Sequence, residues 1–220
     1  MSTTTDTSAP SRRRVSPRLV GWALVALVVL AIALDTTYKN PDYKVTASGR
    51  PAFNAEQYGR TTFPKAAAAL EKNAQPLPAL VSAISDDPEA AGKKFGHRSG
   101  TGPYSFAVKG DGIAGKASNG VLPVKVKGLP KSTAVAIQVG PALPGTAVRD
   151  AAGFIEFGQF LNQVEFADAA TALNNEVKAR VLQGLDAQAL EGKRVSFVGA
   201  FTSFVPTTIT ITPVKLEPAS

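Results

Sequence analysis

The sequence predicts an α+β protein with an N-terminal membrane helix, a small helical subdomain and an OB-like five-stranded Greek-key barrel. Three observations predict it. Residues 19–34 carry no charge, and helix signals dominate residues 54–96, the expected helical subdomain. From Gly102 onward, apolar and polar residues alternate in five runs, with one long amphipathic segment between the third and fourth runs. This is the chain order of an OB-type barrel.

The N-terminus predicts export. Residues 1–18 contain four arginines and are expected to form a cytoplasmic tail, because positively charged flanks stay inside. As a helix, segment 19–34 would reach roughly 24 Å, which is short for a bilayer core of about 30 Å but long for a signal peptide. An uncleaved single-pass anchor in the inner or cytoplasmic membrane is favoured, and cleavage after Ala33 stays open because Ala31 and Ala33 form an A-x-A pattern. Both alternatives place the bulk of the chain in the periplasm or its extracytoplasmic equivalent.

Residues 35–53 are polar and broken by proline, which is typical of a linker. Asn54 is a good N-cap for a helix over residues 55–63. Pro64 is expected to interrupt that helix, and residues 66–72 are strong helix formers.

Two further short helices are expected at residues 79–85 and 89–94, with Pro78 and Pro88 in their first turns and Gly96 as the closing cap. About forty residues rarely fold alone. The apolar side chains of this region should therefore share a core with the next piece: Phe63, Leu70, Leu77, Leu80, Val81 and Ile84.

The barrel domain is expected over residues 97–220. Its first strand begins with the alternating run 104–109. Asp111-Gly112 then forms either a tight turn or a bulge within one long first strand. The pair Asn119-Gly120 predicts a hairpin into a second strand at 121–127, and residues 134–139 form a third run.

A long amphipathic helix is predicted over residues 159–183, between two glycines, with one face packed on a sheet. Two more alternating runs follow, at 195–202 and 208–212, and Pro213 is expected at an edge or a strand end. The apolar stripe of the helix recurs at three- and four-residue spacings: Phe166, Ala170, Leu173, Val177 and Val181.

The composition excludes several kinds of chemistry. The chain of 220 residues has no Cys and one His, so disulfides, thiolate metal sites and Cys nucleophiles are ruled out. A zinc site usually draws on several His or Cys ligands, so no metal and no cofactor is expected. Ser-His-Asp catalysis would need His97 as its base. Because a lone histidine is usually an ordinary surface or turn residue, no enzyme is expected.

The charge of the exported part is mildly basic. The whole chain carries +7, and residues 1–35 account for four arginines and two aspartates, which leaves +5. Since this part faces away from cytosolic nucleic acid, the charge indicates solubility, or attraction to anionic lipid headgroups and acidic partners. No nucleic-acid partner is expected.

The densest run of special residues is 138–150, which reads QVGPALPGTAVRD. One interpretation is a polar pocket where this loop meets the long helix, with Arg149 holding an anionic or hydroxyl-rich ligand. The alternative is that Arg149 and Asp150, with Asn162 and Gln163, satisfy loop backbone groups that would otherwise be buried unpaired, as a loop with two prolines and two glycines requires. The candidate ligand or partner-binding residues are Gln138, Gly145, Thr146, Arg149, Asp150, Asn162 and Gln163.

The run IQVGPALPGTAVRDAAGFIEFGQFLNQVEFADAATALN, with the later GKRVSFVGAF and ITPVKL, resembles the predicted periplasmic lipoproteins of domain-of-unknown-function family 2291. The resemblance implies a helical subdomain beside an α/β barrel, often an association with sugar importers of the ATP-binding-cassette class, and no known activity. The chain departs from the family label because it has no lipobox Cys and so no lipid anchor. The membrane helix would take its place.

The first functional hypothesis is therefore a non-catalytic, membrane-tethered accessory to an ATP-binding-cassette solute importer, contacting the permease or the solute-binding protein. The alternative is a stand-alone barrel that binds a small molecule or glycan. A hydrolase that uses His97 is the third hypothesis.

Overall fold

The computed structural model describes residues 52–202 and 207–219. The predicted cytoplasmic tail, the membrane segment and all but the last two residues of the linker lie outside these residues. Within the described ranges, no helix combines the length and the apolar character needed to cross a membrane.

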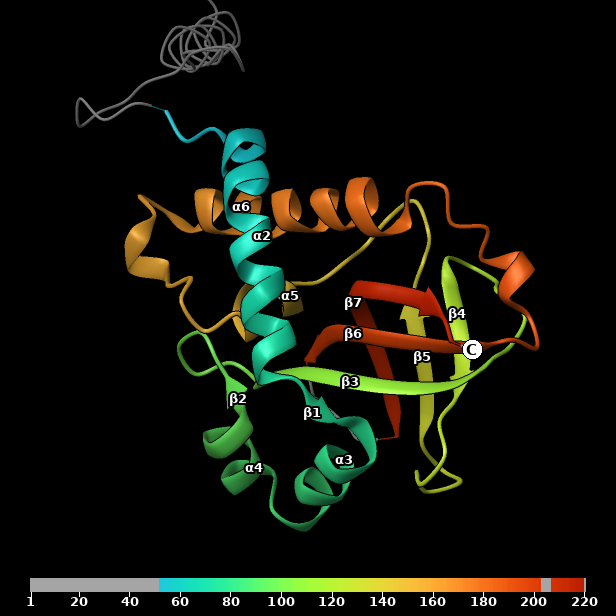
Figure 1. Ribbon diagram of the computed structural model, residues 1–220. Helices are drawn as coiled ribbons and strands as arrows, with labels where there is room; N and C mark the ends of the chain where they lie inside the picture. Colours follow the sequence, from blue (N-terminus) through green and yellow to red (C-terminus); the bar gives the residue numbers. More distant parts are fainter. Residues whose placement is uncertain (1–51, 203–206, 220) are drawn as a thin grey trace, which may run out of the picture. The chain divides into compact units, whose positions relative to one another are not determined.

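Five strands form a closed barrel (Figure 1). In order around the barrel, the first strand pairs with the second, the second with the third, the third with the fifth, the fifth with the fourth, and the fourth again with the first. Only the pairing of the third with the fifth is parallel. The predicted OB-like barrel is confirmed by these strands: β3 (Ser105–Ala114), β4 (Val121–Lys125), β5 (Ala134–Gln138), β6 (Arg194–Thr202) and β7 (Thr208–Pro218).

β3 is one continuous strand. It pairs with β6 without a register shift, from Ser105 opposite Thr202 to Ile113 opposite Arg194. Asp111-Gly112 therefore lies within the long first strand and forms neither a turn nor a bulge. The predicted hairpin is present, because Asn119 and Gly120 have φ of 51° and 77° and an antiparallel bridge joins the residues on either side.

Pro213 does not end its strand, but it lies where only one side of β7 is paired, which is the edge position that the prediction allowed. β7 continues through Pro213 to Pro218, and the irregularity takes another form, since Gly199 of β6 pairs with Pro213 while the preceding Val198 pairs with Lys215. This leaves an extra residue in β7, which is a bulge. Proline has no N–H to donate, so an interrupted ladder accommodates it, and the pairing of β7 with β5 has already ended at Ile211.

Within residues 52–104, three helices precede the barrel: α2 (Ala55–Asn73), α3 (Leu77–Asp86) and α4 (Pro88–Phe95). Two-residue strands, β1 (Gln75–Pro76) and β2 (Gly96–His97), add to β3. Asn54 caps α2 as predicted, since its side chain accepts a 2.9 Å hydrogen bond from the Gln57 N–H. Pro78 and Pro88 lie in the first turns of α3 and α4, and Gly96 caps α4, also as predicted.

The predicted interruption at Pro64 is wrong, because α2 runs through it. A proline inside a helix leaves the carbonyl four residues earlier without its donor. Here that carbonyl belongs to Arg60, and it accepts a 3.2 Å hydrogen bond from the Arg180 guanidinium. A side chain from far along the sequence thus replaces the missing helix bond.

The predicted long helix is present from Gln163 to Leu182, with a later start and a π-helical last turn. A 3₁₀ turn, η1 (Phe157–Gln159), precedes α6 (Gln163–Val177), and a π-helical turn, η2 (Lys178–Leu182), follows it. Asn162 starts α6 by accepting a 2.9 Å bond from the Glu165 N–H, which is why the helix begins later than predicted. A second 3₁₀ turn, η3 (Gln188–Leu190), leads into β6.

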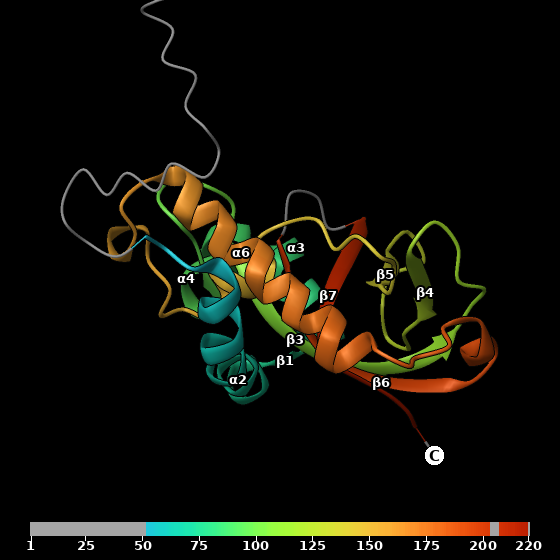
Figure 2. The same cartoon turned by 90° about the horizontal axis from the view of Figure 1, so that it is seen from above.

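The helical piece shares its core with the barrel, as expected. Leu77 and Leu80 of α3 join a cluster with residues of the barrel interior such as Phe197. Phe63 of α2 joins a second cluster with Leu173 of α6. α2 packs against α6, which it crosses in Figure 1 and lies beside in Figure 2. The boundary between a subdomain at 54–96 and a barrel domain at 97–220 stays a prediction.

Candidate functional site

The loop after β5 is fixed from two sides. Asn174, buried in the middle of α6, donates from its side-chain amide to the carbonyl oxygens of Leu143 and Gly145, both at 2.9 Å. Gln138 donates to the Pro144 carbonyl at 3.2 Å and accepts from the Thr212 hydroxyl at 2.9 Å. These contacts set the position of the loop before it reaches the next helix.

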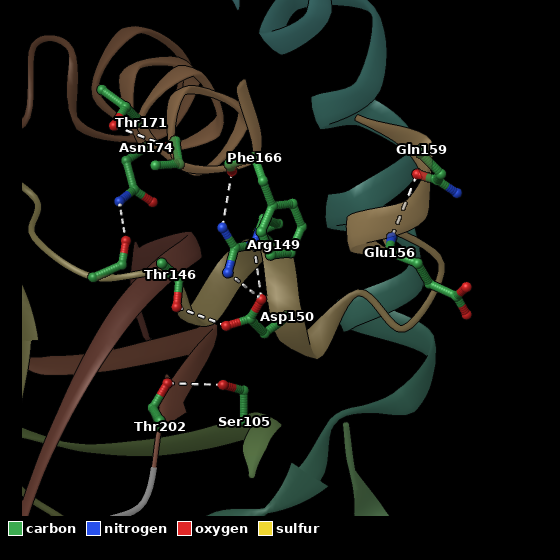
Figure 3. A network of polar contacts seen from close by, with 12 residues as sticks. Ser105, Thr146, Arg149, Asp150, Glu156, Gln159, Phe166, Thr171, Asn174 and Thr202 are labelled. Carbon is green, nitrogen blue, oxygen red and sulfur yellow. Dashed lines mark hydrogen bonds and ion pairs between the residues drawn. The ribbon is translucent and has the colours of Figure 1, made fainter. Parts of the chain in front are cut away.

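The short helix α5 (Ala147–Ala151) follows this loop and was not predicted. It carries a buried ion pair between Arg149 and Asp150 (Figure 3). Asp150 accepts from Arg149 Nε at 2.8 Å and from the Thr146 hydroxyl at 2.6 Å. Both oxygens of this carboxylate are therefore engaged within the protein.

The remaining contacts of Arg149 are made with α6. One terminal nitrogen donates to the Phe166 carbonyl at 2.8 Å, and the guanidinium lies 3.5 Å from the centroid of the Phe166 ring. Of the five N–H donors of an arginine, one on Nε and one on a terminal nitrogen make hydrogen bonds here, and the other terminal nitrogen lies 2.7 Å from the Asp150 carboxylate in the ion pair. No buried side-chain nitrogen or oxygen among the described residues lacks a hydrogen-bond partner. The loop carbonyl groups are thus satisfied by Gln138 and Asn174. Arg149 and Asp150, which the alternative interpretation assigned to this role, instead bond to each other, to Thr146 and to α6.

A cavity of about 730 Å³ lies beside this ion pair. Five of the seven predicted site residues line it, namely Gly145, Thr146, Arg149, Asp150 and Gln163. The other two do not: Gln138 holds the loop, and Asn162 caps α6. The remaining lining residues are Ser99, Gly100, Gly102, Pro103, Phe157, Phe166, Ala167 and Thr202.

The wall of the cavity is mixed in character. Thr202 shares a 2.8 Å hydrogen bond with the buried Ser105 hydroxyl from the neighbouring strand (Figure 3). Gln163 is exposed at the start of α6, and its side-chain amide makes no hydrogen bond within the part of the chain that the structure describes. Phe157 and Pro103 add apolar surface. The wall therefore combines a few polar groups in fixed positions with apolar surface, which is typical of small-molecule sites.

The segment 99–103 was missed by the sequence reasoning. It contributes four lining residues to the cavity, and the only signal for it was the run SGTGP, which indicates a turn and nothing more specific. Phe166 was predicted to lie on the apolar, core-facing side of the helix, and it is buried. Its ring also stacks against the guanidinium of Arg149, a contact that the sequence did not indicate.

A smaller cavity of about 330 Å³ adjoins the first and shares Asp150 and Phe157 with it. His97 lines this second cavity, is exposed, and lies against Gly153. Among the described residues, His97 makes no hydrogen bond to a Ser or an Asp. Within the same residues, no cluster of three or more His, Asp or Glu side chains is placed to hold a metal ion.

One phenol near the ion pair has a shifted pKa. Burial raises the pKa of Tyr58 above its ordinary value near 10, against the lowering effects of a hydrogen bond from Thr62 and of the positive charge on Arg149. The neutral phenol is therefore favoured in the folded protein.

Comparison with known proteins gives one family and one fold. The model of the family described as "Predicted periplasmic lipoprotein (DUF2291)" matches residues 23–217. The crystal structure of an OB-fold protein from Thermotoga maritima is similar, with a TM-score of 0.65 and 22% identity over 77% of this chain and 100% of that one. At this identity the likeness shows the fold alone. No curated protein matches the sequence.

Proposed function

The chain belongs to the DUF2291 family of predicted periplasmic lipoproteins, and from this premise we propose that it is a non-catalytic binding protein held at the outer face of the cell membrane by its N-terminal segment. The family places the protein outside the cytoplasm. Lipoproteins are anchored through a cysteine, and this chain has none. The uncharged segment 19–34, which the family match overlaps from residue 23, supplies a hydrophobic anchor in its place.

The binding role is carried by the cavity beside Arg149 and Asp150. Its volume of about 730 Å³ suits a small solute, since ligand pockets span roughly 300–1,000 Å³. The cavity wall offers hydroxyl, amide and guanidinium groups next to the ring of Phe157. This combination fits a solute with many hydroxyl groups and an apolar face.

The charge at the site favours a neutral solute over an anion. The positive charge of Arg149 is already neutralised by Asp150 at 2.7 Å, so the pair presents no net charge to the cavity. Unused N–H donors of the guanidinium stay available for hydroxyl oxygens. We therefore propose a neutral, hydroxyl-rich small molecule, such as a sugar, as the ligand class.

The test is a thermal-shift screen of the full-length protein in mild detergent, with a panel of neutral mono- and disaccharides. At a concentration about a hundred times Kd, a bound sugar stabilises the folded protein by about 2.7 kcal/mol, which raises Tm by several degrees. A panel that leaves Tm unchanged at every concentration would contradict the proposal.

The second candidate is the accessory role to an ATP-binding-cassette importer, which the family resemblance implied. Exposed apolar side chains beside the cavity, Phe157, Leu161 and Val164, favour a protein contact there. The test is quantitative affinity purification of the tagged full-length protein from gently solubilised membranes. If this candidate is right, we expect near-stoichiometric recovery of permease or solute-binding subunits. Recovery of the protein alone would contradict a stable complex with an importer.

A further inference from the structure

Three exposed apolar side chains gather at the start of α6. Phe157, Leu161 and Val164 are 41%, 53% and 67% exposed, and they lie within eight consecutive residues. They are three of the four large hydrophobic residues exposed among the described residues, and the fourth, Ile113, lies on β3. Scattered apolar residues are ordinary on a surface, but a cluster marks an interaction site. We call Phe157, Leu161 and Val164 the α6-start face.

The local structure holds these side chains outward. The Glu165 carboxylate accepts a 2.9 Å hydrogen bond from the Leu161 N–H, and Asn162 caps the first turn of α6. The intervening Phe160 turns inward, with its ring 5.6 Å from that of Phe53 and 5.3 Å from that of Phe166. Since Phe160 takes the core position, the α6-start face is displayed by a well-packed segment.

The stretch of chain that carries this face is acidic, and the two arginines that line cavities with Phe157, Arg98 and Arg149, are each paired with a carboxylate, of Glu89 and Asp150. Residues 151–177 contain no Lys or Arg, whereas the chain after residue 35 carries a net charge of +5. On α6, Glu165 and Asp168 lie one helical turn after Leu161 and Val164, and the Glu156 carboxylate points away from the Arg149–Asp150 pair (Figure 3). None of these three carboxylates forms an ion pair within the described residues.

We propose that the α6-start face docks an extracytoplasmic protein partner that presents apolar side chains flanked by Lys or Arg. Apolar burial would supply the affinity, and the three carboxylates would select the charge of the partner. The anionic headgroups of a membrane surface would be repelled by the same carboxylates, so lipid does not fit this face. The inference goes beyond solute binding and stands without it, and it specifies the surface that an importer subunit would contact.

The experiment places a photo-crosslinking amino acid at Val164 of the full-length protein in isolated native membranes. The matched control position is Ile113, which is also apolar and 47% exposed but pairs with Lys125 and Arg194 in the sheet. Crosslinked products are digested, and the partner segment is sequenced by mass spectrometry. We expect a protein adduct from position 164 alone, at a segment with Lys or Arg within one helical turn of an apolar residue.

Two surface variants separate docking from folding. Asp168→Lys reverses a charge beside the face and should lower the yield of the adduct about tenfold. Glu71→Lys makes the same change on an exposed residue of α2 and should leave the yield unchanged. Raising the salt to 1 M, where the Debye length falls to about 3 Å, should also lower the yield. An adduct to lipid, to a second copy of the chain or to a segment without Lys or Arg would overturn the proposal, and so would the absence of any adduct.

Discussion

The side-chain amide of Asn174 donates to the carbonyl oxygen of Gly145 at 2.9 Å and so ties the middle of α6 to the rim of the cavity. The same amide also reaches the Leu143 carbonyl. One buried side chain therefore sets the path of the loop that leads into α5. The site depends on this tie, because Thr146, Arg149 and Asp150 follow directly after it.

Asn174→Ala removes both of these hydrogen bonds and leaves the Leu143 carbonyl buried without its donor. We expect the free energy of unfolding to fall by about 3 kcal/mol, since an unsatisfied buried polar group costs about 1–3 kcal/mol. Urea titration of the purified protein measures this change. Asn175→Ala, at the exposed neighbouring position, should shift the free energy by less than about 0.5 kcal/mol. Equal effects of the two variants would show that the hydrogen bonds from Asn174 to the loop do not stabilise the fold.

Arg149→Ala leaves the Asp150 carboxylate without its cation, although that side chain is only 11% exposed. The expected loss of stability is about 3–5 kcal/mol, as for one partner of a buried pair. Arg98→Ala is the control, because Arg98 pairs with Glu89 at 3.7 Å on the surface and should cost less than about 1 kcal/mol. Wild-type stability in Arg149→Ala would contradict the claim that the ion pair stabilises the fold.

The contact between Arg180 and the Arg60 carbonyl predicts a coupling to Pro64. Arg180→Ala should cost about 1 kcal/mol in the wild-type chain, where Pro64 cannot donate to that carbonyl. In a Pro64→Ala background the helix supplies its own donor, so the same substitution should cost less. A double-mutant cycle by urea unfolding measures the difference, and strict additivity would contradict the assignment.

Tyr58 predicts a pH dependence at the alkaline end. Burial raises the pKa of this phenol in the folded protein above about 10, so the folded state holds the proton more tightly than the unfolded state. Its contribution to stability is complete below pH 10 and is lost as the pH rises through the raised pKa. Tyr58→Phe has no such proton, so between pH 9 and pH 11.5 its stability should fall less steeply than that of the wild type. Parallel profiles would contradict the shift.

The barrel was predictable because its signals are local. Alternation marks each strand, and the Asn119-Gly120 pair fixes a hairpin whatever the rest of the chain does. The wrong prediction for Pro64 and the unpredicted bulge beside Pro213 share one cause. Pro64 is tolerated through Arg180, which lies 120 positions from Arg60, and Pro213 is accommodated by a bulge that exists only when β7 pairs with β6. Such compensation is invisible in the flanking sequence.

The candidate site was predictable in part for the same reason. Polar residues between β5 and the start of α6 stood out by type, and four of them line the cavity together with Gly145. The opposite wall, residues 99–103, comes from a turn that only the closed barrel brings next to α5 and α6. The stacking of Arg149 on Phe166 likewise requires the packed helices.

The most direct measurement of the central claim is calorimetric titration of the full-length protein with the sugar that raises Tm most. Gln163 separates binding from folding, because its exposed side chain lines the cavity and makes no hydrogen bond within the described residues. We expect Gln163→Ala to keep the wild-type Tm and to weaken binding about tenfold, the loss of roughly one hydrogen bond. Gln183→Ala, an exposed glutamine that lines none of the described cavities, should keep the wild-type Kd. Equal affinity in the wild type and Gln163→Ala, or no heat of binding at all, would contradict a solute site in this cavity.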